Sequence, residues 1–461
     1  MKQILIKNAF VVCETDEADA DVLVKDEKIA EIGKYINAPD AYVIDARNKI
    51  LIPGGVDIHT HFCLDVGFTK ASDDFYTGTV AAAFGGTTTI VDHPGFGPEG
   101  CALNYQIEAY HLLARDKAVI DYGFHGVVQH VNSEILSEMN TLVKDGITSF
   151  KIYLTYNYRI EDKEAFNFIS HAASLGALTA VHAENHGVIE ALRERFKAQN
   201  LLSPYYHALS RPDECEAEAV SRMALIARLA GDAPLYIVHL SSALSLEFVK
   251  AARERGQRQL FVETCPQYLF LDASRYEEEK HGGLKYIMCP PLRSAVDNTR
   301  LIKGLENDID VVATDHCPFF FASQKLRGKD DFMLCPSGAP GVEERIPLLF
   351  SAVIKRRLGL KRFVELCCEN PAKIAGIYPQ KGVVRTGSDA DLVIINPNEY
   401  AILSAASLKS NVDYSIYEGF KTLGMPETVI SRGEIIVDHG KLSASAGRGR
   451  FLKRAPAQTP R

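Results

Sequence analysis

The sequence predicts an α/β protein, a (β/α)8 TIM-type barrel with a small β-sandwich domain built from both chain ends. Short runs rich in β-branched residues recur between residues 54 and 318, with helical stretches between them. This alternation is typical of parallel strands joined by crossover helices. Outside that region, strand-like segments are joined by polar turns instead. A chain of 461 residues also suits one large domain with a smaller one beside it.

Eight runs make up the predicted barrel, which is the number of strands that closes this fold. In order they are GVDIHTHF, TTTIVDH, DYGFHGVV, ITSFKIYL, ALTAVHAEN, PLYIVHLSS, QLFVETCPQYL and DVVATDHCPF. We therefore expect a barrel domain over residues 53–380. Residues 1–52 and 381–440 are expected to form the two parts of the β-sandwich, from segments such as ILIKNAFVV and ADLVIINP. Residues 441–461 are left as a basic C-terminal tail, either solvated or lying at a subunit contact.

Composition narrows the class of protein. The net charge of −8 argues against a surface that binds nucleic acid or an anionic membrane, because both of these partners are negatively charged and are bound by basic surfaces. Neither a signal-peptide core nor an apolar run of membrane-spanning length is found, so we expect a cytoplasmic protein. The ten cysteines are scattered without a CxxC pair, and we expect reduced thiols.

The candidate site lies at the C-terminal ends of the predicted strands, where barrel enzymes place their chemistry. Alternate strand residues point to the same side, so His59 and His61 can hold one ion together. An isolated His-x-His is weak evidence, but other strand ends carry further ligand types. The candidate metal ligands are His59, His61, Lys151, His182, His239 and Asp315. This set exceeds the needs of one tetrahedral zinc ion and suggests two metal ions.

Lys151 is the unusual member of the set, because an ammonium group has no lone pair and repels cations. Reaction of its amine with carbon dioxide would give a carbamate, which can bridge two metals as a carboxylate. We therefore expect Lys151 to be N6-carboxylysine. The alternative is that Lys151 pairs with an acid at the mouth of the barrel.

Other histidines and cysteines lie near strand ends but exceed what a two-metal site needs. We interpret them as orienting or packing residues. They are His93, His125, His130, His186, His316, Cys265 and Cys317. Neither a phosphate-binding GxxxxGK[ST] loop, a dinucleotide fingerprint nor a G-x-S-x-G elbow occurs in a strand-to-helix context.

At these residues the chain resembles the amidohydrolase superfamily, and within it the D-hydantoinase and dihydropyrimidinase family. The motifs that match in order are PGGVDIHTHF, GGTTTIVDH, SFKIYLTY, VHAEN, ATDHCPF and GAPGVEERIPLLF. The resemblance implies a homotetramer with two divalent metal ions per subunit. Zn²⁺ is the expected metal, although ligands of this kind also bind manganese or cobalt. It places His59, His61, carbamylated Lys151 and Asp315 on one metal, and Lys151, His182 and His239 on the other.

The resemblance also implies the reaction. A metal-bridging hydroxide would open the ring amide of a small cyclic imide or ureide, giving an N-carbamoyl amino acid from 5-monosubstituted, aromatic D-hydantoins. Asp315 would transfer the proton, and Tyr156 would stabilise the oxyanion. Alternatives are a dihydropyrimidinase acting on dihydrouracil or dihydrothymine, and a non-catalytic scaffold of the same fold. Dihydroorotase is disfavoured because Cys63 stands where that family has an arginine.

Two positions depart from the family pattern. Cys289 stands where the family has a substrate-binding serine, and Ser337 stands where the family has an asparagine. The swaps are compatible with the same substrate if both positions hold the imide ring through backbone atoms, whereas a different specificity is expected if their side chains take part. An apolar pocket for an exocyclic side chain is one interpretation of the loop residues, and packing of the barrel rim is the other. These loop residues are Phe62, Leu64, Phe68, Tyr153 and Tyr158.

Overall fold

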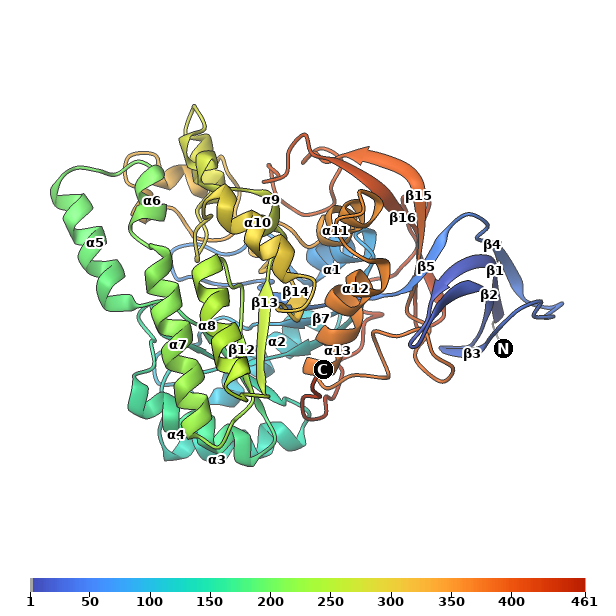
Figure 1. Cartoon of the computed structure of the whole chain (residues 1–461), viewed down its shortest axis with the longest axis horizontal. Helices are drawn as coiled ribbons and strands as arrows, with labels where there is room; N and C mark the ends of the chain where they lie inside the picture. Colours follow the sequence, from blue (N-terminus) through green and yellow to red (C-terminus); the bar gives the residue numbers. More distant parts are fainter. Residues whose placement is uncertain (1–2, 461) are drawn as a thin grey trace.

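A parallel barrel forms the centre of the molecule (Figure 1), and the computed structural model describes residues 3–460. Its strands are β6 (Gly55–Thr60), β7 (Thr87–Asp92), β8 (Asp121–Phe124), β9 (Gly126–Val127), β10 (Ser149–Tyr153), β11 (Leu178–His182), β12 (Leu235–Ile237), β13 (Leu260–Thr264) and β14 (Val311–Val312). Only His125 separates β8 from β9, so together they occupy one position of the barrel. Every neighbouring pair is parallel.

The barrel closes between its first and last strands. The backbone N–H of Asp315 donates to the carbonyl of His59 at 2.9 Å, and that of His61 donates to the carbonyl of His316 at 2.9 Å. The predicted (β/α)8 fold is therefore confirmed, with eight strand positions in the order of the chain. Closure also brings His59, on the first strand of the barrel, next to Asp315, which follows the last strand.

Helices surround the barrel on its outer face (Figure 1). The α-helices are α1 (Phe75–Phe84), α2 (Leu103–Ala114), α3 (Ser133–Lys144), α4 (Asp162–Ser174), α5 (His186–Ala198), α6 (Tyr205–Leu209), α7 (Asp213–Leu229), α8 (Ala243–Glu254), α9 (Pro266–Phe270), α10 (Ala295–Gly304), α11 (Arg345–Ile354), α12 (Leu360–Val364) and α13 (Asn370–Ile374). Short 3-10 turns cover Ala273–Glu277, Gly282–Tyr286, Lys325–Gly328 and Phe332–Leu334, and a π-turn covers Glu365–Glu369. Among the described helices, none is both long and apolar enough to cross a membrane.

The β-sandwich domain joins strands from both ends of the chain. They are β1 (Gln3–Val12), β2 (Glu17–Lys25), β3 (Lys28–Gly33), β4 (Tyr42–Asp45), β5 (Ile50–Pro53), β15 (Leu392–Ile402), β16 (Lys421–Ser431), β17 (Glu434–Asp438) and β18 (Lys441–Leu442). The antiparallel pairing of β5 with β15 links the two halves, because Leu392 lies opposite Pro53. Consecutive buried residues along β1, at positions 4–6 and 11–12, show that this strand is covered on both faces there.

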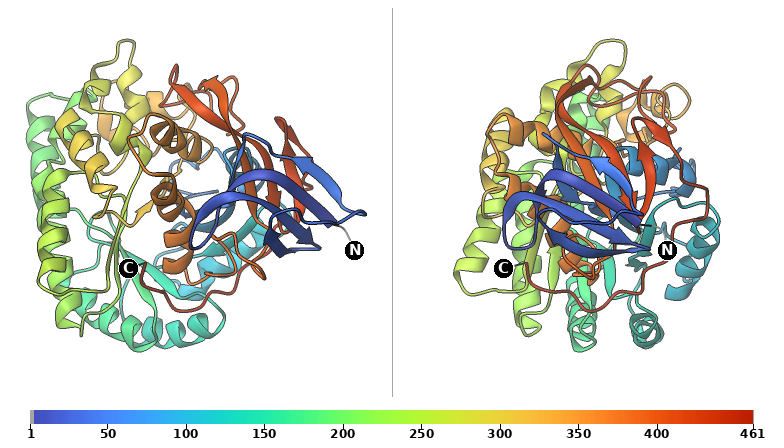
Figure 2. Two further views of the ribbon diagram at one scale, coloured as in Figure 1. Left: turned by 45° about the vertical axis from the view of Figure 1, so that its right-hand side comes forward. Right: turned by 90° about the vertical axis from the view of Figure 1, so that its right-hand side faces the viewer.

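The C-terminal tail packs on the barrel of its own chain (Figure 2). It lies at the N-terminal ends of the strands, where the carbonyl of Tyr122 accepts from Leu452 and that of Gly146 accepts from Arg454. Leu452 and Arg454 are buried there. The tail is thus attached to its own subunit, and a role at a subunit contact stays a prediction.

Candidate metal centre

All nine residues proposed from the sequence line one cavity of about 960 Å³ at the C-terminal ends of the strands. They are His59, His61, Lys151, Tyr156, His182, His239, Cys289, Asp315 and Ser337. His59 lies on β6, Lys151 on β10 and His182 on β11, while His239 and Asp315 follow β12 and β14. Candidate metal ligands up to 256 positions apart in the chain, His59 and Asp315, therefore share one site because successive strands stand side by side in a closed barrel.

Asp315 lies at the centre of the first predicted ligand group. Its Oδ1 atom is 3.2 Å from Nε2 of His59 and 3.2 Å from Nε2 of His61. The two imidazoles hold the pKa of this carboxyl group well below its ordinary value, although burial acts in the opposite direction. Asp315 is therefore an anion that faces two ring nitrogens, as a shared cation would require.

The second group adjoins the first. The ring of His239 lies 4.6 Å from that of His182 and 5.4 Å from that of His59, measured between ring centres. Burial lowers the pKa of both His182 and His239, so these rings are neutral. Neutral imidazole is the form that binds metals. Spacing and protonation state thus suit neighbouring metal sites.

Glu263, at the end of β13, supports the histidines from behind. Its Oε1 atom lies 2.6 Å from Nδ1 of His59 and accepts the backbone N–H of His239 at 2.9 Å. Burial lowers the pKa of His59, but this contact and Asp315 outweigh burial and raise it to about 9, so a metal ion would have to displace the proton on Nε2. Holding Nδ1 leaves Nε2 directed at the cavity, which is the usual arrangement behind a metal-binding histidine. The sequence interpretation missed Glu263, although its place at a strand end was a signal.

Glu184 does the same for His182. Its Oε2 atom lies 2.7 Å from Nε2 of His182 and accepts from Nη1 of Arg211 at 2.5 Å. Burial opposes ionisation of Glu184, but Arg211 lowers its pKa to about 2. Nε2 of His182 is thereby occupied and Nδ1 remains for the cavity. Glu184 follows His182 by two residues, a spacing from which its role could have been predicted.

The donor set fits divalent metal ions. Among residues 3–460, Nδ1 of His61 and Nδ1 of His239 are buried without a hydrogen-bond partner, and Nε2 of His59 faces Asp315 at 3.2 Å without hydrogen-bond geometry. Buried polar atoms are nearly always satisfied, so orphaned ring nitrogens around one carboxylate indicate an additional ligand. His59, His61 and His93 offer nitrogens that all lie within 4.8 Å of one another. A histidine cluster that could hold a metal ion is therefore present in the described part of the chain.

Lys151 reaches this cluster from β10 and is 1 % exposed. Burial lowers the pKa of its ammonium group to about 8, against the attraction of Asp315 and Glu263. Its nitrogen lies 5.2 Å from the centre of the Tyr153 ring, and among residues 3–460 it has no ion-pair partner. The alternative interpretation was a salt bridge between Lys151 and an acid at the barrel mouth, and no acid among residues 3–460 forms one.

Three of the site residues have positive φ angles, which are rare outside glycine. These angles are 72° at Tyr156, 39° at His239 and 54° at Asp315. Such conformations cost of order 1–3 kcal/mol each and are found mainly where function requires them. The sharp turns after the strands direct these side chains into the cavity.

The histidines that we interpreted as orienting or packing residues differ in their contacts. His125 stacks on His93 at 4.1 Å between ring centres. His316 contacts Asp73 at 2.9 Å and accepts from the N–H of Gly341. His93, in contrast, has no hydrogen-bond partner on either ring nitrogen within the described part of the chain, and its ring lies against those of His59 and His61.

The substrate side of the cavity contains Tyr156, Cys289 and Ser337. Sγ of Cys289 lies 3.5 Å from Oγ of Ser337. Burial, assisted by Cys289, raises the pKa of Tyr156 well above its ordinary value. The phenol is therefore protonated at neutral pH and can donate a hydrogen bond.

Aromatic loop residues form the outer wall of the cavity. Leu64, Phe68, Tyr153 and Tyr158 line it as the pocket interpretation expects. Phe96 was missed, and its ring lies 5.2 Å from that of Tyr153 and 4.8 Å from that of Tyr158. The pocket interpretation was wrong for Phe62, because its side chain is fully buried in the barrel wall. It packs edge-on against Phe75 at 5.6 Å between ring centres.

Comparison with known proteins identifies the family. The model of the amidohydrolase family matches residues 50–436. The chain belongs to this family. It is 48 % identical to a D-phenylhydantoinase of Escherichia coli O1:K1 over 99 % of each chain.

Solved structures of hydantoinases and dihydropyrimidinases are also similar to this chain. The dihydropyrimidinase of Brevibacillus agri has a TM-score of 0.97 and 42 % identity over 99 % of each chain. The L-hydantoinase of Arthrobacter aurescens has a TM-score of 0.89 and 31 % identity, covering 98 % of this chain and 100 % of that one.

This membership establishes the general class of the protein. It is an enzyme, a hydrolase of the hydantoinase and dihydropyrimidinase type. Its fold is the barrel with a β-sandwich that its structural neighbours share. The amidohydrolase family is typically metal-dependent, in agreement with the histidine cluster.

Proposed function

We propose that the enzyme is a metal-dependent cyclic amidase that opens 5-monosubstituted, aromatic D-hydantoins to N-carbamoyl D-amino acids. The observation that carries this proposal is the joining of all six candidate ligands with Tyr156 in one cavity. The relative named D-phenylhydantoinase, 48 % identical over the full length, supports the substrate class.

The metal ions would be held by two overlapping sets of residues. We assign His59, His61 and Asp315 to one ion and His182 and His239 to the other, with the carbamate of Lys151 shared. Glu263 and Glu184 hold the outer nitrogens of His59 and His182 and so fix the rings. Bound divalent ions, of which we favour zinc, would lower the pKa of water and polarise an amide carbonyl.

The chain's own residues would carry the proton and hold the ring. Asp315 is ionised and accessible from the cavity, so it can accept the proton of the attacking water and pass it to the leaving ring nitrogen. The protonated hydroxyl of Tyr156 can donate to the oxygen that becomes negative during attack. Cys289 and Ser337 would contact the imide through backbone atoms, which tolerates both departures from the family pattern.

The outer wall favours an aromatic substituent. Leu64, Phe68, Phe96 and Tyr158 border the cavity, and a ring at C5 of the hydantoin would pack on them. The same cavity can admit a smaller ring, so dihydropyrimidinase activity is the second candidate. It is favoured by the similarity to the Brevibacillus agri dihydropyrimidinase. A scaffold without activity is disfavoured, because the complete candidate ligand set is retained.

Purified full-length enzyme tests the proposal directly. Ring opening of D-5-phenylhydantoin, its L-enantiomer and dihydrouracil would be followed side by side, with metal per subunit measured on the same sample. We expect turnover of the aromatic D-hydantoin to be the fastest. Fast opening of dihydrouracil alone would select the second candidate, and metal-loaded protein that opens no cyclic amide would overturn the proposal. Gel filtration with light scattering would test the homotetramer, and fractionation would test the cytoplasmic location.

A further inference from the structure

Arg454, in the C-terminal tail, is a buried cation on the opposite side of the barrel from the cavity mouth. Its side chain is 4 % exposed, and its partners among residues 3–460 are all neutral. Nη1 donates to Oγ of Ser149 at 2.8 Å, and Nη2 donates to the carbonyl of Phe124 at 2.5 Å. Burying a cation without an acid is costly and needs a compensating role.

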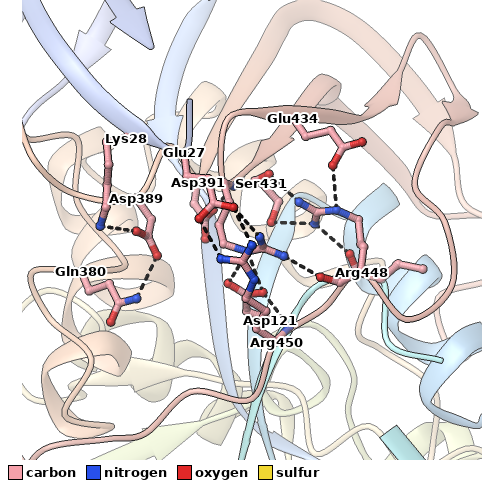
Figure 3. Close-up of polar contacts among 12 residues, drawn as sticks. Glu27, Lys28, Asp121, Gln380, Asp389, Asp391, Ser431, Glu434, Arg448 and Arg450 are labelled. Atoms are coloured by element: carbon pink, nitrogen blue, oxygen red, sulfur yellow. Dashed lines mark hydrogen bonds and ion pairs between the residues drawn. The ribbon is translucent and has the colours of Figure 1, made fainter. Parts of the chain in front are cut away.

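The tail is attached on both sides of Arg454. Upstream, Arg450 pairs with Glu27 at 2.7 Å, and its backbone N–H donates to Asp121 at 2.9 Å (Figure 3). Downstream, the carbonyl of Ala455 accepts from Oγ1 of Thr148 at 2.9 Å. Arg454 is therefore inserted from a segment that is anchored at two points, which leaves its guanidinium little freedom.

A directed chain of hydrogen bonds starts at this guanidinium. Because a guanidinium only donates, Ser149 Oγ accepts from Arg454, and the serine hydrogen is free for Nδ1 of His125 at 2.6 Å. At its other nitrogen, His125 lies 3.0 Å from the carbonyl of Ile58, which only accepts. The hydrogen of His125 must then be on Nε2. Every bond in the chain Arg454, Ser149, His125, Ile58 has one possible direction.

The chain ends beside the candidate metal ligands on two strands. Ser149 precedes Lys151 by two residues on β10, so both side chains face the same side of the strand. Ile58 directly precedes His59 on β6. The His125 ring also stacks on His93, whose ring lies 4.4 Å from that of His59. A displacement at Arg454 would therefore reach both His59 and Lys151.

We propose that Arg454 is a positioning residue of the metal centre, acting through Ser149 and His125 on the strands that present His59 and Lys151. This inference rests on the proposed metal-dependent function. Removing a group that hydrogen-bonds a metal ligand directly typically weakens metal binding about 10- to 100-fold. We expect a loss in the same range here, because this chain acts on the strands of two ligands at once. The same loss is expected whether Arg454 or Ser149 is changed, because both break the same chain.

The test compares Arg454→Met, Arg454→Lys and Ser149→Ala with the matched control Lys453→Met, since Lys453 is the exposed neighbour in the tail. Metal affinity would be measured by competition with a chelator, and the visible absorption of the Co²⁺-loaded protein would report ligand geometry. We expect Arg454→Met and Ser149→Ala to bind metal about 10- to 100-fold more weakly with altered Co²⁺ spectra. Methylguanidine should restore part of the affinity of Arg454→Met, and Lys453→Met should match the wild type.

A purely structural role predicts another pattern. Arg454→Met would then unfold at lower denaturant concentration, while its metal affinity and Co²⁺ spectrum, and those of Ser149→Ala, stayed at wild-type values. That outcome would overturn the proposal. If Arg454→Met does not fold, Ser149→Ala alone decides, because it leaves the tail in place. Metal binding needs no substrate, so this result is distinguishable from a failure of the proposed reaction.

Discussion

Two buried polar clusters in this molecule differ in how completely their atoms are paired. At the junction of barrel and β-sandwich, Nζ of Lys381 lies 2.6 Å from Asp121 and 2.7 Å from Asp391, and Nε of Arg432 lies 3.0 Å from Asp121. In the candidate metal centre, ring nitrogens of His61 and His239 have no hydrogen-bond partner among residues 3–460. A saturated cluster holds the fold together, whereas an unsaturated one keeps ligand atoms available. The completeness of hydrogen bonding therefore distinguishes these two clusters.

Removing the proposed carbamate should have the largest effect. Lys151→Ala is expected to lose metal and to lower kcat/KM by at least about 10³-fold, because both ions lose their shared ligand. Metal analysis and ring-opening assays check this, with the exposed Lys163→Ala as control. Short carboxylic acids should restore some metal and activity to Lys151→Ala. Full activity without them would exclude the carbamate.

Breaking the saturated cluster should affect stability and leave the chemistry intact, because the amide oxygen in Asp121→Asn can still accept the backbone N–H of Arg450 that anchors the tail. Asp121→Asn removes the charge between Lys381 and Arg432 and is expected to lower the free energy of unfolding by about 3–5 kcal/mol. Denaturant titration measures this, and the exposed Asp116→Asn serves as control. If Asp121→Asn changed metal affinity more than stability, the division between the two clusters would not hold.

Much of this organisation could be predicted from sequence, because strand periodicity and strand-end position are local patterns. All six candidate ligands were found in this way, and so was the barrel. Glu263 also lies at a strand end and could have been found by the same argument. Contacts from segments outside the strand pattern were not predictable: Arg454 of the tail approaches Ser149 across 305 positions. For Phe62 the sequence left pocket lining and rim packing open, because nothing local shows that its ring points into the barrel wall.

Weakening the support behind a ligand should have a smaller effect than removing the ligand. Glu263→Gln cannot hold Nδ1 of His59 as an anion, so metal affinity should fall about 10- to 100-fold. Chelator competition measures the change. The control is Glu247→Gln, whose side chain is exposed and paired with Arg300. Unchanged affinity in Glu263→Gln would remove Glu263 from the metal centre.

The smallest effect is expected at the outer wall. Phe96→Ala should raise KM for D-5-phenylhydantoin about 10-fold, because one aromatic contact is worth roughly 1–2 kcal/mol. KM for dihydrouracil, which has no aromatic arm, should stay unchanged. Phe166→Ala, on the outer face of α4, is the control. Equal losses for both substrates would show that Phe96 supports the ring-binding site and not the substituent.

The assignment of the histidine cluster as a metal centre predicts the number of metal ions bound per subunit. Metal per subunit would be measured in the purified wild type by elemental analysis, with Lys151→Ala alongside. About two divalent ions per wild-type subunit, and fewer than one in Lys151→Ala, is the predicted result. A wild type that remains metal-free after incubation with Zn²⁺, Mn²⁺ and Co²⁺ would contradict the assignment of this cluster as a binuclear metal centre.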